Sequence, residues 1–169
     1  MYNLRVRARP MWLFIASEAV LFGSLFFIYV MLRARSTAWP GPVGAFPWLE
    51  TALLVGASAA FGAKRSQLVL SNALGLTFVV IKVIGDAALI SKGITPSTDP
   101  RWASFFTLTG VLAAHVLGGA IFTGWLAGPS FKMAAEDRDR WLARIDATRR
   151  YWLFLDLVWL FIVAGFYFV

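Results

Sequence analysis

The longest uncharged run of this chain constrains its fold more than any other feature, because residues 102–131 contain no Asp, Glu, Lys or Arg. A helix needs only ~20 mainly apolar residues to cross a lipid bilayer. The composition of the whole chain agrees: 59% of its 169 residues are hydrophobic and 15% are charged, whereas soluble domains average about 45–50% and about 25%. The sequence therefore predicts an integral membrane protein and excludes most water-soluble folds.

Five apolar blocks divide the chain, and turn-forming or charged segments separate them. Irregular backbone has to leave the hydrocarbon layer to reach water, so the segments 36–44 and 95–100, rich in Pro, Ser and Thr, are expected at the membrane surface. The first block is read as a retained helix, since it is longer than the apolar region of a signal peptide and lacks a small-residue cleavage site. The chain is thus predicted to form a single transmembrane domain, 1–169. Its fold is an all-α bundle of five transmembrane helices at about 11–32, 46–63, 68–90, 102–127 and 151–169.

The distribution of positive charge predicts the orientation of this bundle. With five crossings, one side of the membrane holds eleven of the sixteen Lys and Arg residues, including Arg5, Arg7 and Arg9 before the first block. The other side holds four, and Lys82 lies within a block. Because Lys and Arg accumulate on the cytoplasmic side, the N-terminus is expected in the cytoplasm and the C-terminus outside.

The longest connection, 132–150, is predicted to be a basic cytoplasmic loop, with six basic and four acidic residues among Ala, Met, Trp and Leu. Its composition also suits a short helix that lies at the membrane interface. A basic loop facing anionic lipid accounts for the net charge of +7. We expect no nucleic acid partner, since the chain has no base-stacking or groove-binding motif.

Ionisable residues inside the apolar blocks are expected to face protein or water, because a charge that faces lipid at a helix centre costs about 2.5–3.5 kcal/mol or more. Glu18 is a candidate for a proton-linked or lipid-linked carboxyl, or for a structural hydrogen-bonding group that stays protonated. Lys82 and Asp86 are four residues apart and share a helix face, so they are expected to form an intramembrane ion pair. That pair fits an internal contact, a contact with a neighbouring subunit, or a proton path.

His115 and Asp156 are the other two proton-linked or lipid-linked candidates. His115 is the only histidine, and one imidazole without a facing carboxylate motif cannot hold a metal or haem, so a packed, hydrogen-bonded histidine is expected. Asp156 shares a helix face with Trp152 and Trp159, which suggests a hydrogen bond between an indole and its carboxylate. No catalytic motif occurs and there is no cysteine, so the sequence predicts neither a catalytic nor a metal site in this chain.

Small residues recur every four positions in two blocks, which lets neighbouring helix backbones approach closely. Close helix packing is therefore expected at Ala52, Gly56 and Ala60 in the second block and at Gly110, Ala114 and Gly118 in the fourth.

Several separated segments resemble one family, subunit III of the haem-copper respiratory oxidases (cytochrome c oxidase subunit III), in its short five-helix form. The segment MWLFIASEAVLF, at 11–22, resembles the family's first shared signature, whose Ser-Glu pair falls on Ser17 and Glu18. The segments FFTLTG and HVLGG, which end in Gly110 and Gly119, resemble the second, and YWLFLDLVWLF, at 151–161, resembles the C-terminal one. TALL, from Thr51 to Leu54, is similar to the family's next helix. The likeness covers nearly the whole chain, with the signatures in the family's order.

The chain also departs from the family pattern. Leu112 stands where the family's fourth-helix signature usually has a second His, and Leu153 stands where its C-terminal signature reads Tyr-Trp-His. Lys82, Gly85 and Asp86 stand where the third helix often has a Gln and a Glu-Tyr pair. These changes indicate a divergent branch and leave the identity of the oxidase open.

The resemblance implies a supporting role in aerobic respiratory electron transport. In the family, haems and copper belong to subunits I and II, while subunit III packs on subunit I, binds phospholipid and helps to sustain proton uptake. It implies no cofactor in this chain, membership of a proton-translocating oxidoreductase complex such as cytochrome c oxidase, and a place in a bacterial inner membrane. The family's best-known intramembrane carboxyl corresponds to Glu18.

Other functions stay open at the level of sequence. Within the family these are subunit III of a quinol oxidase, an accessory subunit of a nitric oxide reductase, and a purely structural lipid-binding spacer. A different class is a small proton or ion transporter. Its relay would require Glu18, Lys82, Asp86 and His115, from three helices, to converge on one water-filled path.

Overall fold

The computed structural model describes residues 9–36, 39, 43 and 47–168, and throughout this part of the chain the secondary structure is helical, without a strand. Arg5 and Arg7, most of the connection 36–44 and the outer ends of the second and fifth predicted blocks lie outside the described residues. The described elements are α2 (Arg9–Arg35), α3 (Trp48–Ala60), α4 (Arg65–Ser91), α5 (Pro100–Ala127), the 3-10 turn η1 (Pro129–Lys132), α6 (Met133–Glu136), α7 (Arg138–Val163) and the π-helical turn η2 (Ala164–Phe168).

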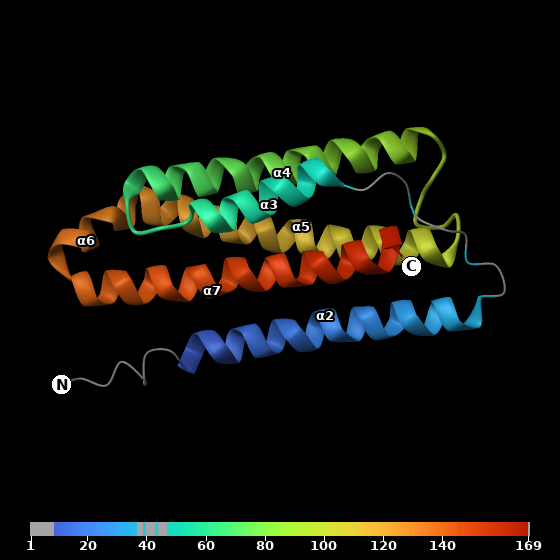
Figure 1. Ribbon diagram of the computed structural model, residues 1–169, viewed down its shortest axis with the longest axis horizontal. Helices are drawn as coiled ribbons and strands as arrows, with labels where there is room; N and C mark the ends of the chain where they lie inside the picture. The colour runs from blue at the N-terminus through green and yellow to red at the C-terminus, as the bar shows by residue number, and fades with distance from the viewer. Residues whose placement is uncertain (1–8, 37–38, 40–42, 44–46, 169) are drawn as a thin grey trace.

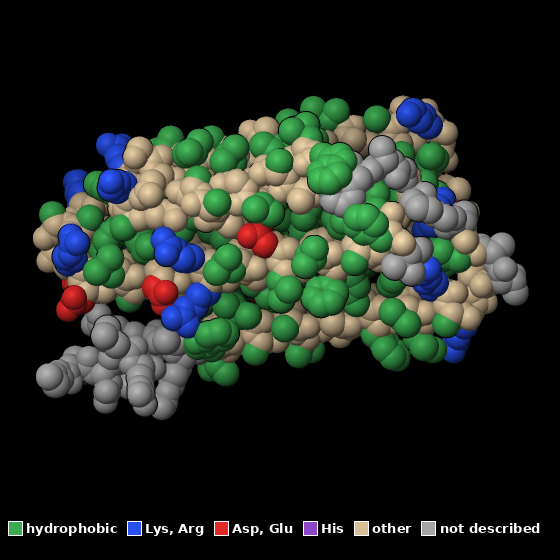
Figure 2. Space-filling view, viewed as in Figure 1, with side chains coloured by type: hydrophobic (Ala, Val, Ile, Leu, Met, Phe, Trp, Pro, Cys, Tyr) green, Lys and Arg blue, Asp and Glu red, His purple; other side chains and the backbone are tan. Residues whose placement is uncertain are grey.

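The long helices run side by side, and successive ones point in opposite directions along a shared axis (Figure 1). Four helical segments are long and apolar enough to cross a bilayer, namely Met11–Arg35, Arg65–Ser91, Pro100–Ala127 and Arg138–Phe168. Hydrophobic side chains cover the middle of the face in Figure 2, and Lys and Arg gather toward its two ends. The prediction of an all-helical fold is therefore confirmed for the described residues, and four of the five predicted crossings have helices of membrane-spanning length and composition.

The second predicted block forms a helix shorter than expected. α3 has 13 residues, so it is about 20 Å long and does not match the ~30 Å thickness of the hydrocarbon layer. Pro47 precedes it, and at its other end Phe61 already has an extended backbone, with ψ of 127°. Proline and an extended residue thus cut the helix from the expected 46–63 to Trp48–Ala60.

The boundary of the last helix also differs from the sequence prediction. α7 begins at Arg138, so most of the predicted basic loop, 132–150, forms the first turns of the same helix that was expected to begin at Tyr151. The Asp137 carboxylate caps it by accepting a hydrogen bond from the Arg140 amide (3.0 Å), which satisfies an amide that the helix itself leaves unpaired. Hydropathy detects only the apolar half of such a helix, because its polar half lies beyond the lipid.

Trp152 lies at the centre of the packed core, where it is fully buried. A Cβ atom on Gly75 of α4 would stand 2.6 Å from the Trp152 ring, and one on Gly119 of α5 would stand 3.0 Å from the Tyr151 ring. Only glycine lets α4 and α5 approach α7 this closely. At the expected positions Gly110 and Gly118, by contrast, a Cβ would meet nothing within 4 Å, so the close packing of α5 on α7 uses a different face, which contains Gly119. On α3, a Cβ on Gly56 would touch Leu74 at 3.5 Å.

Two arginines secure helix ends at the end of the bundle where α6 lies. Arg65 Nε donates a hydrogen bond to the Ala127 carbonyl at the end of α5 (3.0 Å). Arg149 donates one to the Phe61 carbonyl just beyond α3 (3.3 Å). Cationic donors suit these positions because the last carbonyls of a helix lack partners and carry partial negative charge. Part of the basic charge is therefore structural.

α2 lies along one side of the bundle (Figure 1) and packs through one narrow stripe. Its less exposed residues follow the alternating spacing of four and three that is typical of a coiled-coil seam, whereas most of its other side chains face outward. The stripe consists of Met11, Ile15, Glu18, Phe22, Leu25, Tyr29 and Leu32.

Candidate functional site

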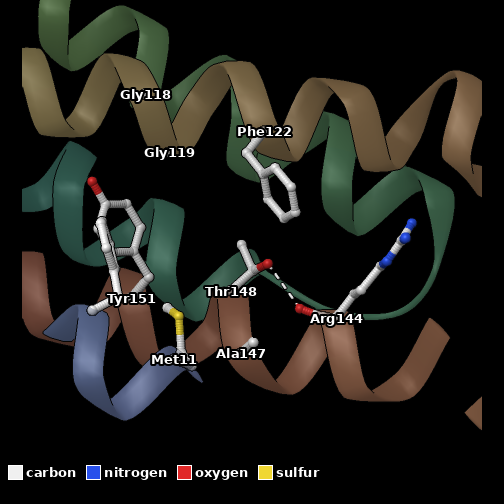
Figure 3. Close-up of a pocket in the computed structure, with 9 residues that line it drawn as sticks. Met11, Gly118, Gly119, Phe122, Arg144, Ala147, Thr148 and Tyr151 are labelled. Carbon is white, nitrogen blue, oxygen red and sulfur yellow. Dashed lines mark hydrogen bonds between the residues drawn. The ribbon is translucent and has the colours of Figure 1, made fainter. Parts of the chain in front are cut away.

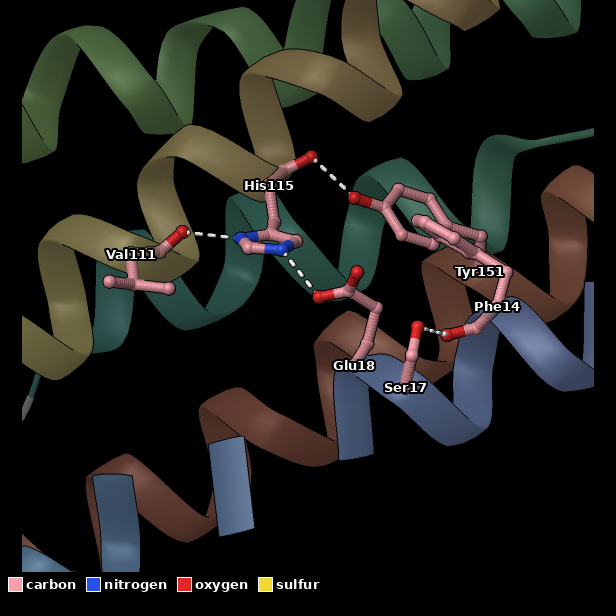
Figure 4. Close-up of polar contacts among 6 residues, drawn as sticks. All are labelled: Phe14, Ser17, Glu18, Val111, His115 and Tyr151. Atoms are coloured by element: carbon pink, nitrogen blue, oxygen red, sulfur yellow. Dashed lines mark hydrogen bonds and ion pairs between the residues drawn. The ribbon is translucent and has the colours of Figure 1, made fainter. Parts of the chain in front are cut away.

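Glu18 lies on the inward stripe of α2 and meets His115 of α5 (Figure 4). Glu18 Oε2 and His115 Nε2 are 2.7 Å apart, and the two side chains are only 14% and 19% exposed. The other ring nitrogen, Nδ1, lies 2.7 Å from the carbonyl oxygen of Val111. From the sequence, Glu18 and His115 were two separate candidates. In the structure their side chains contact each other directly.

The hydrogen bonds of this pair determine how many protons it holds. A carbonyl oxygen can only accept, so His115 Nδ1 carries a proton and donates it to Val111. At 2.7 Å, one further proton must lie between Nε2 and Oε2. Whether it belongs to a carboxylic acid facing a neutral imidazole or to an imidazolium facing a carboxylate, the pair is neutral overall. A neutral pair is what a lipid-embedded site tolerates.

Aromatic side chains enclose the Glu18–His115 pair. The Phe22 ring stands edge-on to the imidazole, with centroids 5.2 Å apart. The Tyr151 hydroxyl of α7 donates a hydrogen bond to the His115 carbonyl (2.9 Å), which connects the pair to a third helix. These aromatic side chains help to keep bulk solvent away from the pair. Within the pair, a proton can move along the hydrogen bond between the imidazole nitrogen and the carboxyl oxygen.

Lys82 and Asp86 form an ion pair within α4. Lys82 is only 4% exposed, and its ammonium lies 4.6 Å from the centre of the Phe105 ring, a favourable cation–π distance. Glu50 of α3 lies within electrostatic range of both. Buried Lys82 therefore has its counter-charge within its own helix.

The four residues required by a transporter relay do not converge. Lys82 contacts Phe105, and His115 lies ten residues further along α5, which is about 15 Å along a helix axis. The structure therefore contains two separate polar pairs, Glu18–His115 and Lys82–Asp86, at different levels of the bundle.

Asp156 forms no hydrogen bond with either tryptophan. Trp152 Nε1 donates to the Thr123 hydroxyl (3.2 Å), and Trp159 Nε1 donates to the Thr51 hydroxyl (3.0 Å). The suggested hydrogen bond between an indole and the carboxylate is therefore wrong: both indoles point to threonines on neighbouring helices. Spacing within α7 could not reveal these partners, because they lie on α3 and α5.

A groove of about 450 Å³ opens between the beginning of α2, the end of α5 and α7 (Figure 3). Its walls are almost entirely apolar, and Arg144 stands at one end with its guanidinium 5.0 Å from the centre of the Trp125 ring. The exposed Gly118 lines this groove, so its missing side chain widens the groove and does not bring helices together. The lining residues are Met11, Phe14, Gly118, Gly119, Phe122, Arg144, Ala147, Thr148 and Tyr151.

Sequence reasoning missed two contributors to the Glu18–His115 site, Val111 and Tyr151. The Val111 carbonyl could have been found, because it lies one helical turn before His115. The Tyr151 contact could not, because it depends on how α5 and α7 are rotated. Among the described residues no group of three or more His, Cys, Asp or Glu side chains could hold a metal ion.

Comparison with known proteins identifies relatives along nearly the full chain, although no family model matches. The chain is 29% identical to the probable quinol oxidase subunit 3 of Staphylococcus haemolyticus (strain JCSC1435), over 94% of this chain and 86% of the relative. It is 28% identical to the quinol oxidase subunit 3 of Bacillus subtilis (strain 168), over 96% of this chain and 87% of the relative. Together with the signature segments in order, these relatives support the resemblance of the chain to subunit III of the haem-copper oxidases.

Proposed function

We propose that the protein is a non-catalytic subunit III of a haem-copper terminal oxidase that takes its electrons from a quinol. The observation that carries the proposal is the likeness to quinol oxidase subunit 3 over 94–96% of the chain. These relatives favour quinol over cytochrome c, the donor expected from the wider family. The haems and copper then reside in subunits I and II, and this chain packs on subunit I.

The proposed membrane topology has five crossings, with α3 as the short second one, in a bacterial inner membrane. The alternating directions of α2, α3, α4, α5 and α7 support it (Figure 1). The basic residues of the α6 end, among them Arg65, Arg144 and Arg149, support a cytoplasmic location for that end. The N-terminus would then be cytoplasmic and the C-terminus outside.

The Glu18–His115 pair is the proposed link to proton uptake. It holds one proton between two heteroatoms 2.7 Å apart, and Tyr151 connects it to α7, whose first turns lie toward the proposed cytoplasmic side. Near subunit I, such a pair can accept and release a proton without leaving a net charge in the lipid. This separates the proposal from a purely structural spacer.

Phospholipid is the proposed occupant of the groove beside this pair. The apolar walls formed by Met11, Phe14 and Phe122 suit an acyl chain, and Arg144 at one end suits a phosphate group. The groove lies next to α2, the helix that carries Glu18, so a bound lipid would also support the position of that helix.

The test is purification of the complex in mild detergent, with haem, copper and chain composition measured together. We expect the chain to co-purify with haem- and copper-bearing subunits and to show no haem absorbance when isolated. Turnover of the complex should be supported by a reduced quinol and not by reduced cytochrome c. Stoichiometric haem in the isolated chain would contradict the assignment, and activity with cytochrome c alone would contradict the donor.

A second experiment tests proton coupling. Glu18→Gln preserves the size of the side chain but removes the shared proton, so we expect slower proton uptake and a shorter catalytic lifetime of the complex. Ser17→Ala is the matched control, because the Ser17 hydroxyl bonds only to the Phe14 carbonyl of its own helix. Unchanged proton uptake in Glu18→Gln would support the structural spacer instead.

A further inference from the structure

The face formed by α3 and α7 carries a carboxyl group amid apolar side chains. Asp156 lies near the middle of the apolar part of α7. On the same helix Leu153 and Leu160 are 56% and 63% exposed, and on α3 Val55 is 48% exposed. In a bilayer this face would meet hydrocarbon unless another protein covers it.

One oxygen of the Asp156 carboxyl lacks a partner within the chain. Its Oδ1 atom is buried and has no hydrogen-bond partner among the described residues, while the residue as a whole is partly exposed. The nearby indoles are engaged by Thr51 and Thr123. Ser58 is close enough to hydrogen-bond to the carboxyl, although its hydroxyl also lies 3.4 Å from the Leu54 carbonyl, so Ser58 can engage only part of the group. Lipid tails offer no donor to complete the set.

The shape of α3 points to a protein neighbour on this face. Its outward positions include Ala52 and Ala59 on either side of Val55, and small residues let another helix backbone approach closely in lipid.

The outward face of α4 provides the contrast. It exposes Val80, Val83 and Ile84 at 56–62%, and its Thr77 hydroxyl is satisfied by the Ala73 carbonyl (2.8 Å). That face has the properties of a lipid-facing surface, with no polar group in need of a partner.

We propose that the α3–α7 face binds a transmembrane helix of subunit I, and that a hydrogen-bond donor on that helix, a hydroxyl, amide or cationic group, reaches the Asp156 carboxyl. A second copy of this chain fits less well, because a symmetric contact would set carboxyl against carboxyl. The proposal rests on the function proposed above and assigns the surface and the residue through which that function is carried out.

Photo-crosslinking in the intact oxidase tests the surface. A photoreactive p-benzoylphenylalanine is placed at Leu160 or Val55 on the α3–α7 face, or at Val83 on α4 as the matched control, and irradiated in native membranes. We expect crosslinks to the largest subunit from the first two positions and none from Val83. Crosslinks to subunit I only from Val83, or crosslinks from Leu160 and Val55 only to lipid or to a second copy, would overturn the proposal. If the chain fails to co-purify with any oxidase, the function itself is wrong; co-purification without these crosslinks refutes only the surface.

Variants of Asp156 test the donor. Interhelical hydrogen bonds in membranes contribute about 0.6–1.7 kcal/mol, so Asp156→Leu should dissociate from the purified complex about 3- to 18-fold more readily during a detergent wash. Asp156→Asn, which keeps an acceptor oxygen, should be retained nearly as well as the wild-type chain. Asp146→Leu is the control, because Asp146 is exposed and pairs with Arg150 of its own helix. Retention of Asp156→Leu equal to that of Asp146→Leu would overturn the role of the carboxyl. If the Leu variant does not reach the membrane, the crosslinks, made with Asp156 intact, decide the question.

Discussion

The bundle holds its helices together in two different ways, and the contrast between Trp152 and Glu18 shows both. Around Trp152, α4, α5 and α7 touch so closely that Gly75 and Gly119 have no room for a side chain. Around Glu18, α2 contacts the bundle through one narrow stripe of residues. Two hydrogen bonds at different positions along α2 attach it to the bundle: one from Glu18 to His115 (2.7 Å) and one from Tyr29 to the Gly165 carbonyl (2.6 Å).

The difference between the two regions follows from the lipid that surrounds the helices. Lipid is as apolar as the side chains, so burying leucine against leucine gains little, and helices associate through close packing or hydrogen bonds. The Trp152 region uses close packing, supported by one hydrogen bond, and the α2 region relies more on hydrogen bonds. A change in side-chain volume should therefore damage the first region most, and a change in polarity the second.

The largest expected effect is that of Trp152→Ala. Removing a fully buried indole leaves a cavity between three helices, and such changes cost about 3–5 kcal/mol in soluble cores. Reversible unfolding in mixed detergent micelles would measure the loss. Trp12→Ala is the control, because Trp12 is 54% exposed and should contribute little. Equal losses for the two variants would show that the Trp152 region is not held by packing.

Gly75→Ala should have the next largest effect. The new methyl group would stand 2.6 Å from the Trp152 ring, and overpacking of this kind costs about 1–3 kcal/mol. Gly110→Ala is the matched control, since a Cβ there meets no neighbour within 4 Å and alanine favours the helix. The same unfolding measurement compares them, and a stable Gly75→Ala variant would mean that α4 and α7 can separate without loss.

The contrast between these glycines also shows how far the sequence could predict the fold. The helices themselves were predictable, because apolar blocks of membrane length leave the backbone no other structure. Which face of each helix points inward was not, because both faces are apolar. The spacing of Gly110, Ala114 and Gly118 is compatible with close packing, yet Gly119, one position further, makes the contact.

The candidate site was predictable in part for the same reason. Glu18 and His115 stand out because ionisable groups are costly in lipid and so must face protein. Their contact with each other depends on the relative rotation of α2 and α5, which no single sequence pattern contains. The start of α7 at Arg138 was missed because hydropathy cannot follow a helix beyond the membrane.

Glu18→Leu and His115→Leu test the polar region. Each single change leaves the other side chain without its partner, which costs about 1–3 kcal/mol for a buried group. The double variant should lose less than the sum, with a coupling of about 0.6–1.7 kcal/mol. Hydrogen exchange of the α2 amides, compared with those of α4, measures the loosening. Additive losses would show that the two groups do not interact, while Ser17→Ala should leave exchange unchanged.

Tyr29→Phe is expected to have the smallest effect, because it removes one hydroxyl and keeps the ring against Phe166. The lost hydrogen bond to the Gly165 carbonyl is worth about 0.5–1.5 kcal/mol. The hydroxyl also accepts a hydrogen bond from the Arg33 guanidinium of its own helix (2.9 Å), which is lost as well, so the α2 amides near Arg33 should exchange faster. Ser24→Ala, which loses only a hydrogen bond to the Val20 carbonyl of the same helix, serves as the control.

The double variant Glu18→Leu with Tyr29→Phe tests whether the two contacts of α2 are independent. Glu18 and Tyr29 are about 16 Å apart along the helix axis. If the two contacts act independently, the losses of stability in the single variants should add to within about 0.5 kcal/mol. If the double variant loses much less stability than the sum of the single variants, breaking either hydrogen bond already releases α2 as a unit. The two hydrogen bonds would then act as one contact.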